Sequence, residues 1–198
     1  MGKFTRVSQR TFNEIQLDAG SLLKDFDPEN PEWVDENVIC ATKGGINPTC
    51  VPTYSDWAED IDNAPNGMME MMHLDGWEAT LSFTALNITE EMLRLSLGAA
   101  DIDEATGKVT PRRDLKLTDF IDVWWVGDLS DGGFAAIHLM NALSTGGFSL
   151  QTTKNGKSEL AVTLGGHVSI DAQDRVPMEF YIGKAEESGE EGSGELTS

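Results

Sequence analysis

Two neighbouring segments constrain the fold most, because both are apolar at consecutive positions as well as alternate ones. They are IDVWWVGD (residues 121–128) and FAAIHLMNAL (residues 134–143). Their β-branched and aromatic content predicts two strands. Successive side chains of a strand point to opposite faces, so Trp124 and Trp125 must lie on different sides of a sheet.

An antiparallel sheet usually leaves one face to solvent. These two strands therefore need cover on both faces, from a helix, from a long loop or from another chain. Within the second strand, His138 is interpreted as a structural histidine with satisfied ring nitrogens. The candidates for core or subunit-contact positions in the two strands are Trp124, Trp125, Phe134, Ile137 and His138.

Further strands are predicted on both sides of this pair. Asn155-Gly156 predicts a two-residue hairpin turn between GFSLQTTK and KSELAVTL. VPMEFYI predicts a last strand, and two short strands are expected over residues 13–17 and 38–42. WEATLSFTA predicts a half-buried strand by its alternation, with one face formed by Trp77, Ala79, Leu81, Phe83 and Ala85.

One helix is predicted over TEEMLRLSLG (residues 89–98). Asn87 and Glu90 fit an Asn-x-x-Glu capping arrangement, and Gly98 fits the position after the last helical turn. The whole pattern predicts a mainly β fold of two packed antiparallel sheets, a sandwich or barrel, with one short flanking α-helix.

Residues 57–76 (WAEDIDNAPNGMMEMMHLDG) form the longest stretch without a regular pattern and are predicted to be a long mid-chain loop. Its methionines offer an adaptable apolar surface, either for another molecule or as a cap on the domain's own core. Residues 1–185 are predicted to form a single β domain, and residues 186–198 (EESGEEGSGELTS) a disordered acidic tail. The contact candidates in the loop are Asp60, Asp62, Met68, Met69, Met71 and Met72.

The charge balance and the missing motifs exclude several classes of function. The chain has 34 Asp and Glu against 14 Lys and Arg, a formal net charge of −20. Gripping nucleic acid requires clustered Lys and Arg, whereas an acidic wall could enclose nucleic acid without holding it. His73, His138 and His167 have no metal-ligand spacing, and no catalytic motif occurs, so we expect no metal, no cofactor and no enzyme activity. Cys40 and Cys50 are expected to be reduced, and we expect no signal peptide or membrane span.

Several longer stretches carry a resemblance to a known family. They are FNEIQLDAGSLL, ICATKGGI, EDIDNAP, LGAADID, TPRRDLKLTDFIDVWWVGDLSDGGFAAIHLMNALSTGGF and GHVSIDAQDRVPMEFYI, in this order within residues 12–184. On these stretches the chain resembles major tail proteins, the tail-tube subunits of long-tailed bacteriophages of Gram-positive hosts and of related prophage-derived particles. The acidic C-terminus departs from the resemblance, and we expect it to be dispensable for assembly.

The resemblance implies a tube fold whose subunits form hexameric rings that stack into a hollow virion tail, assembled in the cytoplasm of the host bacterium. The implied partners are other copies, the tape-measure protein, the tail terminator and distal tail proteins. DNA would pass through an acidic lumen without specific binding. Residues 57–76 would contact the next ring, and one indole of the Trp pair would lie under the helix or at a subunit seam.

A rival interpretation is a secreted or surface-displayed β-sandwich that binds glycan through exposed aromatic side chains. The resemblance and the expected lack of a signal peptide weigh against it.

Overall fold

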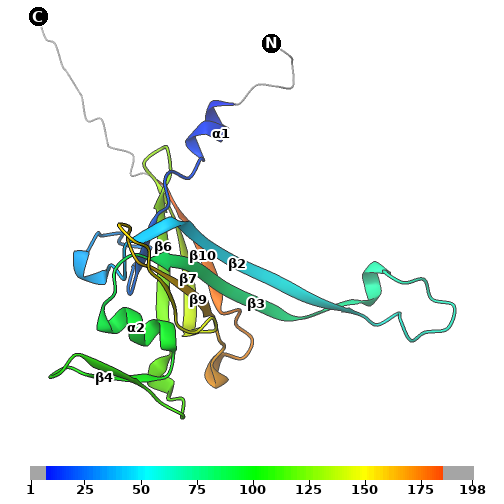
Figure 1. The fold of residues 1–198 in the computed structure, drawn as a ribbon. Helices are drawn as coiled ribbons and strands as arrows, with labels where there is room; N and C mark the ends of the chain where they lie inside the picture. The colour runs from blue at the N-terminus through cyan, green and yellow to red at the C-terminus, as the bar shows by residue number, and fades with distance from the viewer. Residues whose placement is uncertain (1–7, 185–198) are drawn as a thin grey trace, which may run out of the picture.

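The computed structural model describes residues 8–184 and has the mainly β architecture that the sequence predicts (Figure 1). The helices are α1 (Gln9–Asn13) and α2 (Glu90–Leu97), with short 3-10 helices η1 (Asp35–Asn37), η2 (Met69–Met71), η3 (Leu117–Asp119) and η4 (Ile170–Ala172). The strands are β1 (Ser21–Leu23), β2 (Thr42–Asp56), β3 (Met72–Ala85), β4 (Ala100–Asp103), β5 (Lys108–Pro111), β6 (Ile121–Asp128), β7 (Phe134–Ser144), β8 (Ser149–Gln151), β9 (Glu159–Gly165) and β10 (Met178–Gly183).

A large antiparallel sheet with strand order β1-β6-β7-β9-β3-β2 forms the body, and β10 and β8 add to β7 and β9. Strand β7 joins the two halves of this sheet. Its first part pairs with β6 and β10, whereas Leu143 and Ser144 pair with β9. Asn141, at φ 47°, precedes this change of partner. Strands that switch partners in this way make the corners of sandwiches and barrels. β4 and β5 form a separate two-stranded sheet.

The main core lies between the two halves of the large sheet. β6 and β7 contribute Val123 and Leu139, and α2 contributes Met92. The alternation predicted for residues 77–85 is confirmed from Ala79 onward in β3, where Ala79, Leu81, Phe83 and Ala85 are buried. β9 alternates too and buries Leu160, Val162 and Leu164.

The two indoles of β6 lie on opposite faces, and both are covered by the chain itself. Trp125 packs against the main core, and its Nε1 donates a hydrogen bond to the Ala19 carbonyl oxygen at 2.9 Å. Trp124 belongs to a second cluster with Leu23 and Ala136, and Phe26 packs against this cluster. The expected cover by a helix, by the mid-chain loop or by another chain is wrong for Trp124. The segment after β1 provides it, and its irregular sequence, DFDPENPEW, gave no signal of that role.

Two predicted short strands are not formed as expected. In the first of them, residues 13–17, Asn13 ends α1, which forms because the Ser8 side chain accepts a hydrogen bond from the Thr11 backbone amide and caps the helix. The chain then makes only an isolated bridge between Gln16 and Leu129. Of residues 38–42, Val38 makes an isolated bridge and β2 begins only at residue 42, because the neighbouring strand β3 ends opposite that residue.

The predicted N-terminal cap of α2 is displaced, whereas the predicted C-terminal glycine is confirmed. The N-cap of α2 is Thr89, whose hydroxyl accepts from the Met92 amide, while Asn87 instead accepts from the Ala41 amide at 3.0 Å. A threonine adjacent to the helix can reach its first-turn amides more directly than a residue two positions earlier. Gly98 ends α2 at φ 76°, as predicted.

The hairpin between β8 and β9 is confirmed, but its two-residue turn is wrong. Gln151 pairs with Glu159, so residues 152–158 form the connection. Within it, the Gly156 amide donates to the Thr153 carbonyl oxygen at 3.1 Å, and Asn155 has φ 60°. The local turn therefore forms, but it lies inside a wider loop. The predicted tail over residues 186–198 lies outside the described residues.

Cys40 and Cys50 are free thiols, as predicted. Burial raises the pKa of the Cys40 thiol to about 12. A thiol with so high a pKa carries almost no thiolate near neutral pH, and it is the thiolate that reacts. Cys40 therefore acts as a packing residue of the main core.

Candidate functional site

The most prominent candidate is the hairpin of β2 and β3, which projects far from the body (Figure 1). Its strands pair from residue 42 with residue 85 out to residue 56 with residue 72. β9 pairs with β3 only from Thr80 to Ala85. We call residues 50–79 the distal hairpin. It is a two-stranded ribbon with no third strand in the described chain, and such ribbons are at best marginally stable in water on their own.

The sequence forms this long ribbon despite its glycines and prolines. Gly44 and Gly45, at φ 79° and 88°, occupy a register shift between Thr42 and Ile46. Pro48 lacks a backbone N–H, which is tolerated because β2 is the outermost strand of the sheet. Glycines and prolines that are typical of loops are thus accommodated in β2, because β2 is an edge strand with a bulge.

One face of the distal hairpin is a continuation of the core face of β3. Pro52 and Tyr54 are two residues apart in β2 and share a face. Pro52 pairs with Trp77, and Tyr54 pairs with Leu74. Trp77 and Leu74 are three residues apart in β3, so β3 has one extra residue at this point. Paired residues of adjacent antiparallel strands lie on the same side of the sheet. We call this row the apolar strip: Tyr54, Met72, Leu74 and Trp77, each exposed in the chain.

Sequence reasoning missed most of this strip. Trp77 was predicted to lie on the buried row of β3, and it shares that face, but it is 40% exposed because β9 ends before reaching it. Leu74 lies three residues before Trp77 rather than two, so the bulge hides the alternation. A search for alternating apolar residues that permits one inserted residue would have found Leu74.

The predicted loop over residues 57–76 is therefore too long, since β3 begins at Met72. The connection at the tip is held by its own hydrogen bonds. The Asp56 carboxylate accepts from the Gly67 amide at 2.7 Å and from the Ala58 amide at 2.9 Å. These bonds, that from Gly67 above all, hold the pKa of Asp56 below its usual range. The Trp57 amide also donates to the Met71 carbonyl oxygen at 3.0 Å.

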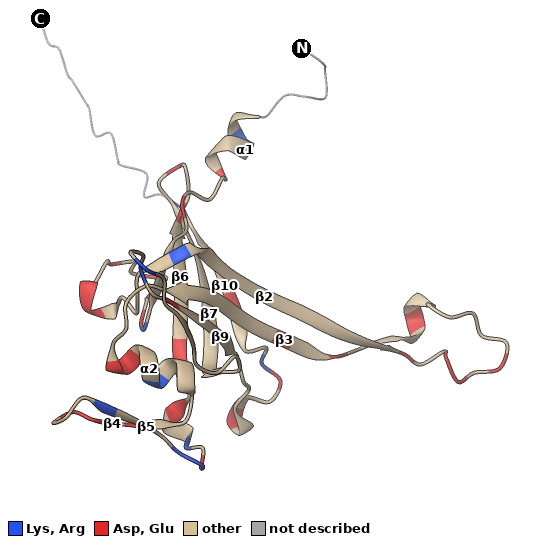
Figure 2. Ribbon diagram, viewed as in Figure 1, with Lys and Arg blue, Asp and Glu red and all other residues tan. Residues whose placement is uncertain are grey.

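The loop candidates all lie at or near this tip. Asp60 and Asp62 are exposed, and the ribbon at the end of the hairpin carries red acidic residues and no blue basic ones in Figure 2. Met69 and Met72 are exposed, whereas Met68 and Met71 are half-buried. None of the four methionines belongs to the buried clusters of the body, so they do not cap the domain's own core.

His138 lies with its ring stacked on the Trp124 indole, at 4.0 Å between centroids and 2° between planes. Its Nε2 is 3.4 Å from an Asp122 oxygen and its Nδ1 is 3.7 Å from a Glu179 oxygen. Nε2 nevertheless has no hydrogen-bond partner in the described chain. The prediction of a fully satisfied histidine is therefore wrong for Nε2; of the two Asp122 oxygens, the other one accepts a hydrogen bond from the Asn141 amide.

The carboxylate beside His138 is well fixed. Glu179 accepts hydrogen bonds from Arg175 and Tyr181, and these two contacts, in that order, lower the pKa of Glu179. The group is therefore a charged, ordered neighbour of the stacked rings.

Phe134 and Ile137 also contact the chain's own clusters. Phe134 packs beside Trp124, and Ile137 packs on the main core. Next to them β10 exposes Phe180 and Ile182, two apolar side chains on the same face of that strand. The body thus has a second exposed apolar area, away from the hairpin.

No known family model matches the chain, and no curated protein sequence matches it. Within residues 8–184, no three His, Cys, Asp or Glu side chains are grouped so as to hold a metal ion. The helices of the same residues are all too short or too polar to cross a membrane.

Proposed function

We propose that this chain is the structural subunit of a hollow tail tube of a long-tailed bacteriophage or a related particle, in which hexameric rings stack along the tail axis. The apolar strip carries this proposal. It extends the core face of β3 beyond the last strand that covers it, so the free chain exposes a surface with the character of a protein interior. Exposed apolar surface of this kind marks sites of protein association.

Another copy of the chain is the partner that fits best. The distal hairpin and the β10 edge lie in different parts of the molecule (Figure 1) and expose different apolar residues. Contacts between two different surfaces on identical subunits close into rings or continue as filaments. Open strand edges add backbone hydrogen bonds to such contacts. A tube of stacked rings combines the two outcomes, because contacts within a ring close around the axis and contacts between rings continue along it. The resemblance to tail-tube subunits agrees with this arrangement.

The charge of the chain suits a conduit. With a formal net charge of −20, a lumen lined by this chain repels DNA phosphates rather than binding them. DNA and the tape-measure protein then pass without specific contacts, and the tail terminator and distal tail proteins bind the ends of the tube. The role is structural rather than catalytic.

The glycan-binding alternative would use exposed aromatic side chains at a hollow. Trp33 and Trp57 are exposed at 62% and 61%. Neither lines the cavity beside α2 or the smaller one beside η4. We therefore prefer the assembly role.

Light scattering after size-exclusion chromatography, followed by negative-stain microscopy of the full chain, tests the proposal. We expect rings or tubes from the wild type. Leu74→Asp should remain folded by circular dichroism and fail to assemble, because it places a charge in the apolar strip. Thr53→Asp is the matched control, since exposed Thr53 directly precedes Tyr54 in β2 and points to the opposite face of the hairpin. A wild type that stays monomeric at every concentration, or a Leu74→Asp variant that assembles normally, would refute the proposal.

A further inference from the structure

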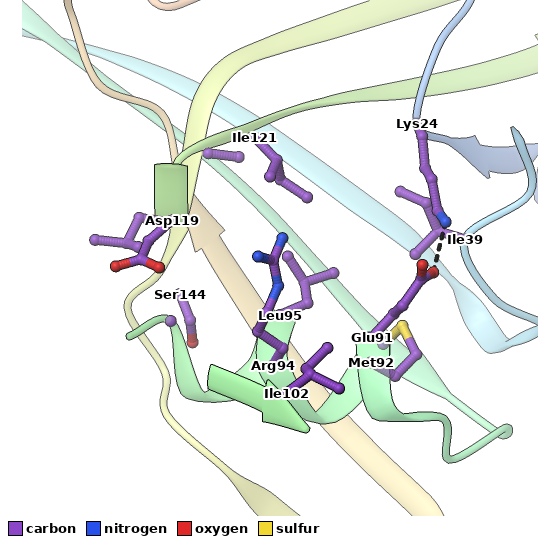
Figure 3. Close-up of a pocket in the computed structure, with 13 residues that line it drawn as sticks. Lys24, Ile39, Glu91, Met92, Arg94, Leu95, Ile102, Asp119, Ile121 and Ser144 are labelled. Carbon is purple, nitrogen blue, oxygen red and sulfur yellow. Dashed lines mark hydrogen bonds and ion pairs between the residues drawn. The ribbon is translucent and has the colours of Figure 1, made fainter. Parts of the chain in front are cut away.

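A cavity of about 360 Å³ lies beside α2, where the start of β6 and the end of β7 meet the small β4–β5 sheet (Figure 3). Its volume falls in the range of binding pockets, about 300–1,000 Å³. Its walls are largely aliphatic, with Met92, Leu95, Ile102, Ile121 and Leu143 among the lining residues.

Four charged side chains line the cavity, and three of them have partners. Lys24 Nζ lies 2.5 Å from a Glu91 oxygen. Asp119 is paired with Arg112 at 2.5 Å and also accepts from the Lys116 amide. Each of these acids is therefore neutralised by a cation of its own.

Arg94 is the exception. Its guanidinium points into the cavity in Figure 3, and it has no ion pair or side-chain hydrogen bond with any residue between 8 and 184. A half-buried arginine without an acid is unexpected in a chain with 34 acidic residues. Guanidinium groups bind carboxylates in bidentate geometry, especially where water is partly excluded. The cavity thus has an apolar interior and one free site for a carboxylate.

The tip of the distal hairpin has the complementary chemistry. Exposed Ile61 lies between Asp60 and Asp62, and Asn63, at φ 66°, turns the chain immediately afterwards. Residues 57–71 contain no lysine or arginine. An apolar side chain flanked by carboxylates fits an apolar cavity with a free guanidinium. The hairpin projects away from α2 (Figure 1), so a tip can only reach the cavity of another copy.

We propose that the hairpin tip of one subunit docks in the α2 cavity of a neighbouring subunit. Ile61 enters the aliphatic interior, and a carboxylate of Asp60 or Asp62 binds Arg94. This inference rests on the proposed assembly and names the surface that receives the hairpin. Tip and cavity are different surfaces, so the contact leaves one of each free at every step and propagates the assembly.

A charge-exchange experiment on the full chain tests the contact. The variants are Arg94→Glu, the pair Asp60→Arg with Asp62→Arg, and the triple combination. Sedimentation velocity measures the concentration at which assembly begins, and circular dichroism checks the fold. Each half of the exchange should raise that concentration at least tenfold, and the triple variant should restore it. Lys154→Glu, at an exposed position on the β8–β9 connection, is the matched control and should have no effect.

The direction of one effect separates the contact from general electrostatics. The paired Asp→Arg variant makes an acidic chain less acidic, so general charge repulsion predicts easier assembly, whereas the docking contact predicts weaker assembly. A folded Arg94→Glu variant that assembles like the wild type, or a folded triple variant that fails to recover, would overturn the inference while the proposed function stands.

Disulfide trapping provides a second test that needs no charge reversal. Ile61→Cys combined with Ser144→Cys, on the cavity wall, should give oligomers linked between subunits under mild oxidation. The same chain with only Ile61→Cys should not. Assemblies that form without any linkage contradict the docking site. A wild type that forms no assembly at all contradicts the proposed function and the docking site together.

Discussion

Replacing Trp124 with alanine should be among the most damaging single changes in this protein. The side chain is 8% exposed and belongs to the cluster that seals the second face of β6. Its ring contacts His138 at 4.0 Å, Tyr181 at 5.6 Å and Phe26 at 5.7 Å between centroids. Truncating a buried Trp to Ala costs about 3–5 kcal/mol, from lost apolar transfer energy and the cavity left behind. For a domain of this size that corresponds to a melting temperature lower by roughly 6–20 °C.

Urea unfolding followed by circular dichroism, on freshly prepared subunits, measures this free energy directly. Trp125→Ala is the internal comparison. That indole is only half-buried, and its one hydrogen bond, to Ala19, is worth about 1 kcal/mol. We therefore expect Trp125→Ala to cost less than Trp124→Ala. A loss below about 1 kcal/mol for Trp124→Ala, or the reverse order of the two variants, would refute the account of how residues 24–38 cover the sheet.

Four further outcomes are expected. Gly183→Ala should lower the free energy of unfolding by about 1–3 kcal/mol in urea titrations, because a Cβ there would lie 2.0 Å from the Phe134 ring; wild-type stability would contradict this. Asp56→Asn should loosen the hairpin tip at neutral pH in ¹⁵N relaxation. The wild type should show the same loosening only in acid. The ionised Asp56 carboxylate stabilises the tip at pH values above the ordinary carboxyl pKa of about 3.9, and this stabilisation is lost as the pH falls through the lowered pKa of Asp56. Truncation before residue 186 should leave assembly unchanged in micrographs, and loss of tubes would show that this segment is structural. Replacing the four tip methionines with serine should leave a folded chain that assembles poorly; these residues are Met68, Met69, Met71 and Met72. Hydrogen exchange on the wild type measures whether assembly protects the tip, and equal protection in free and assembled chains would contradict ordering by a neighbour.

The candidate site was predictable only in part. The acids and methionines of the tip stand out because no periodic pattern includes them, and residues 57–71 do form the end of the hairpin. The apolar strip did not stand out, because one extra residue in β3 moves Leu74 out of phase with Trp77. Arg94 looks like any helical arginine in the sequence. Arg94 lacks a partner because the acids around it already pair with Lys24 and Arg112, and these pairs form only in the folded structure.

Local patterns in the sequence determined several of the strands and where α2 lies. Side-chain alternation and helix ends depend on residues a few positions apart, so β3, β6, β7 and β9 could be assigned without knowledge of the fold. The tertiary structure alone decided what covers each face. Phe26 reaches Trp124 across about a hundred residues of chain, and the pairing of β9 with β3 stops at Thr80 of β3 and leaves the distal hairpin bare. Burial depends on contacts between segments distant in the chain, and no local pattern encodes which segments meet.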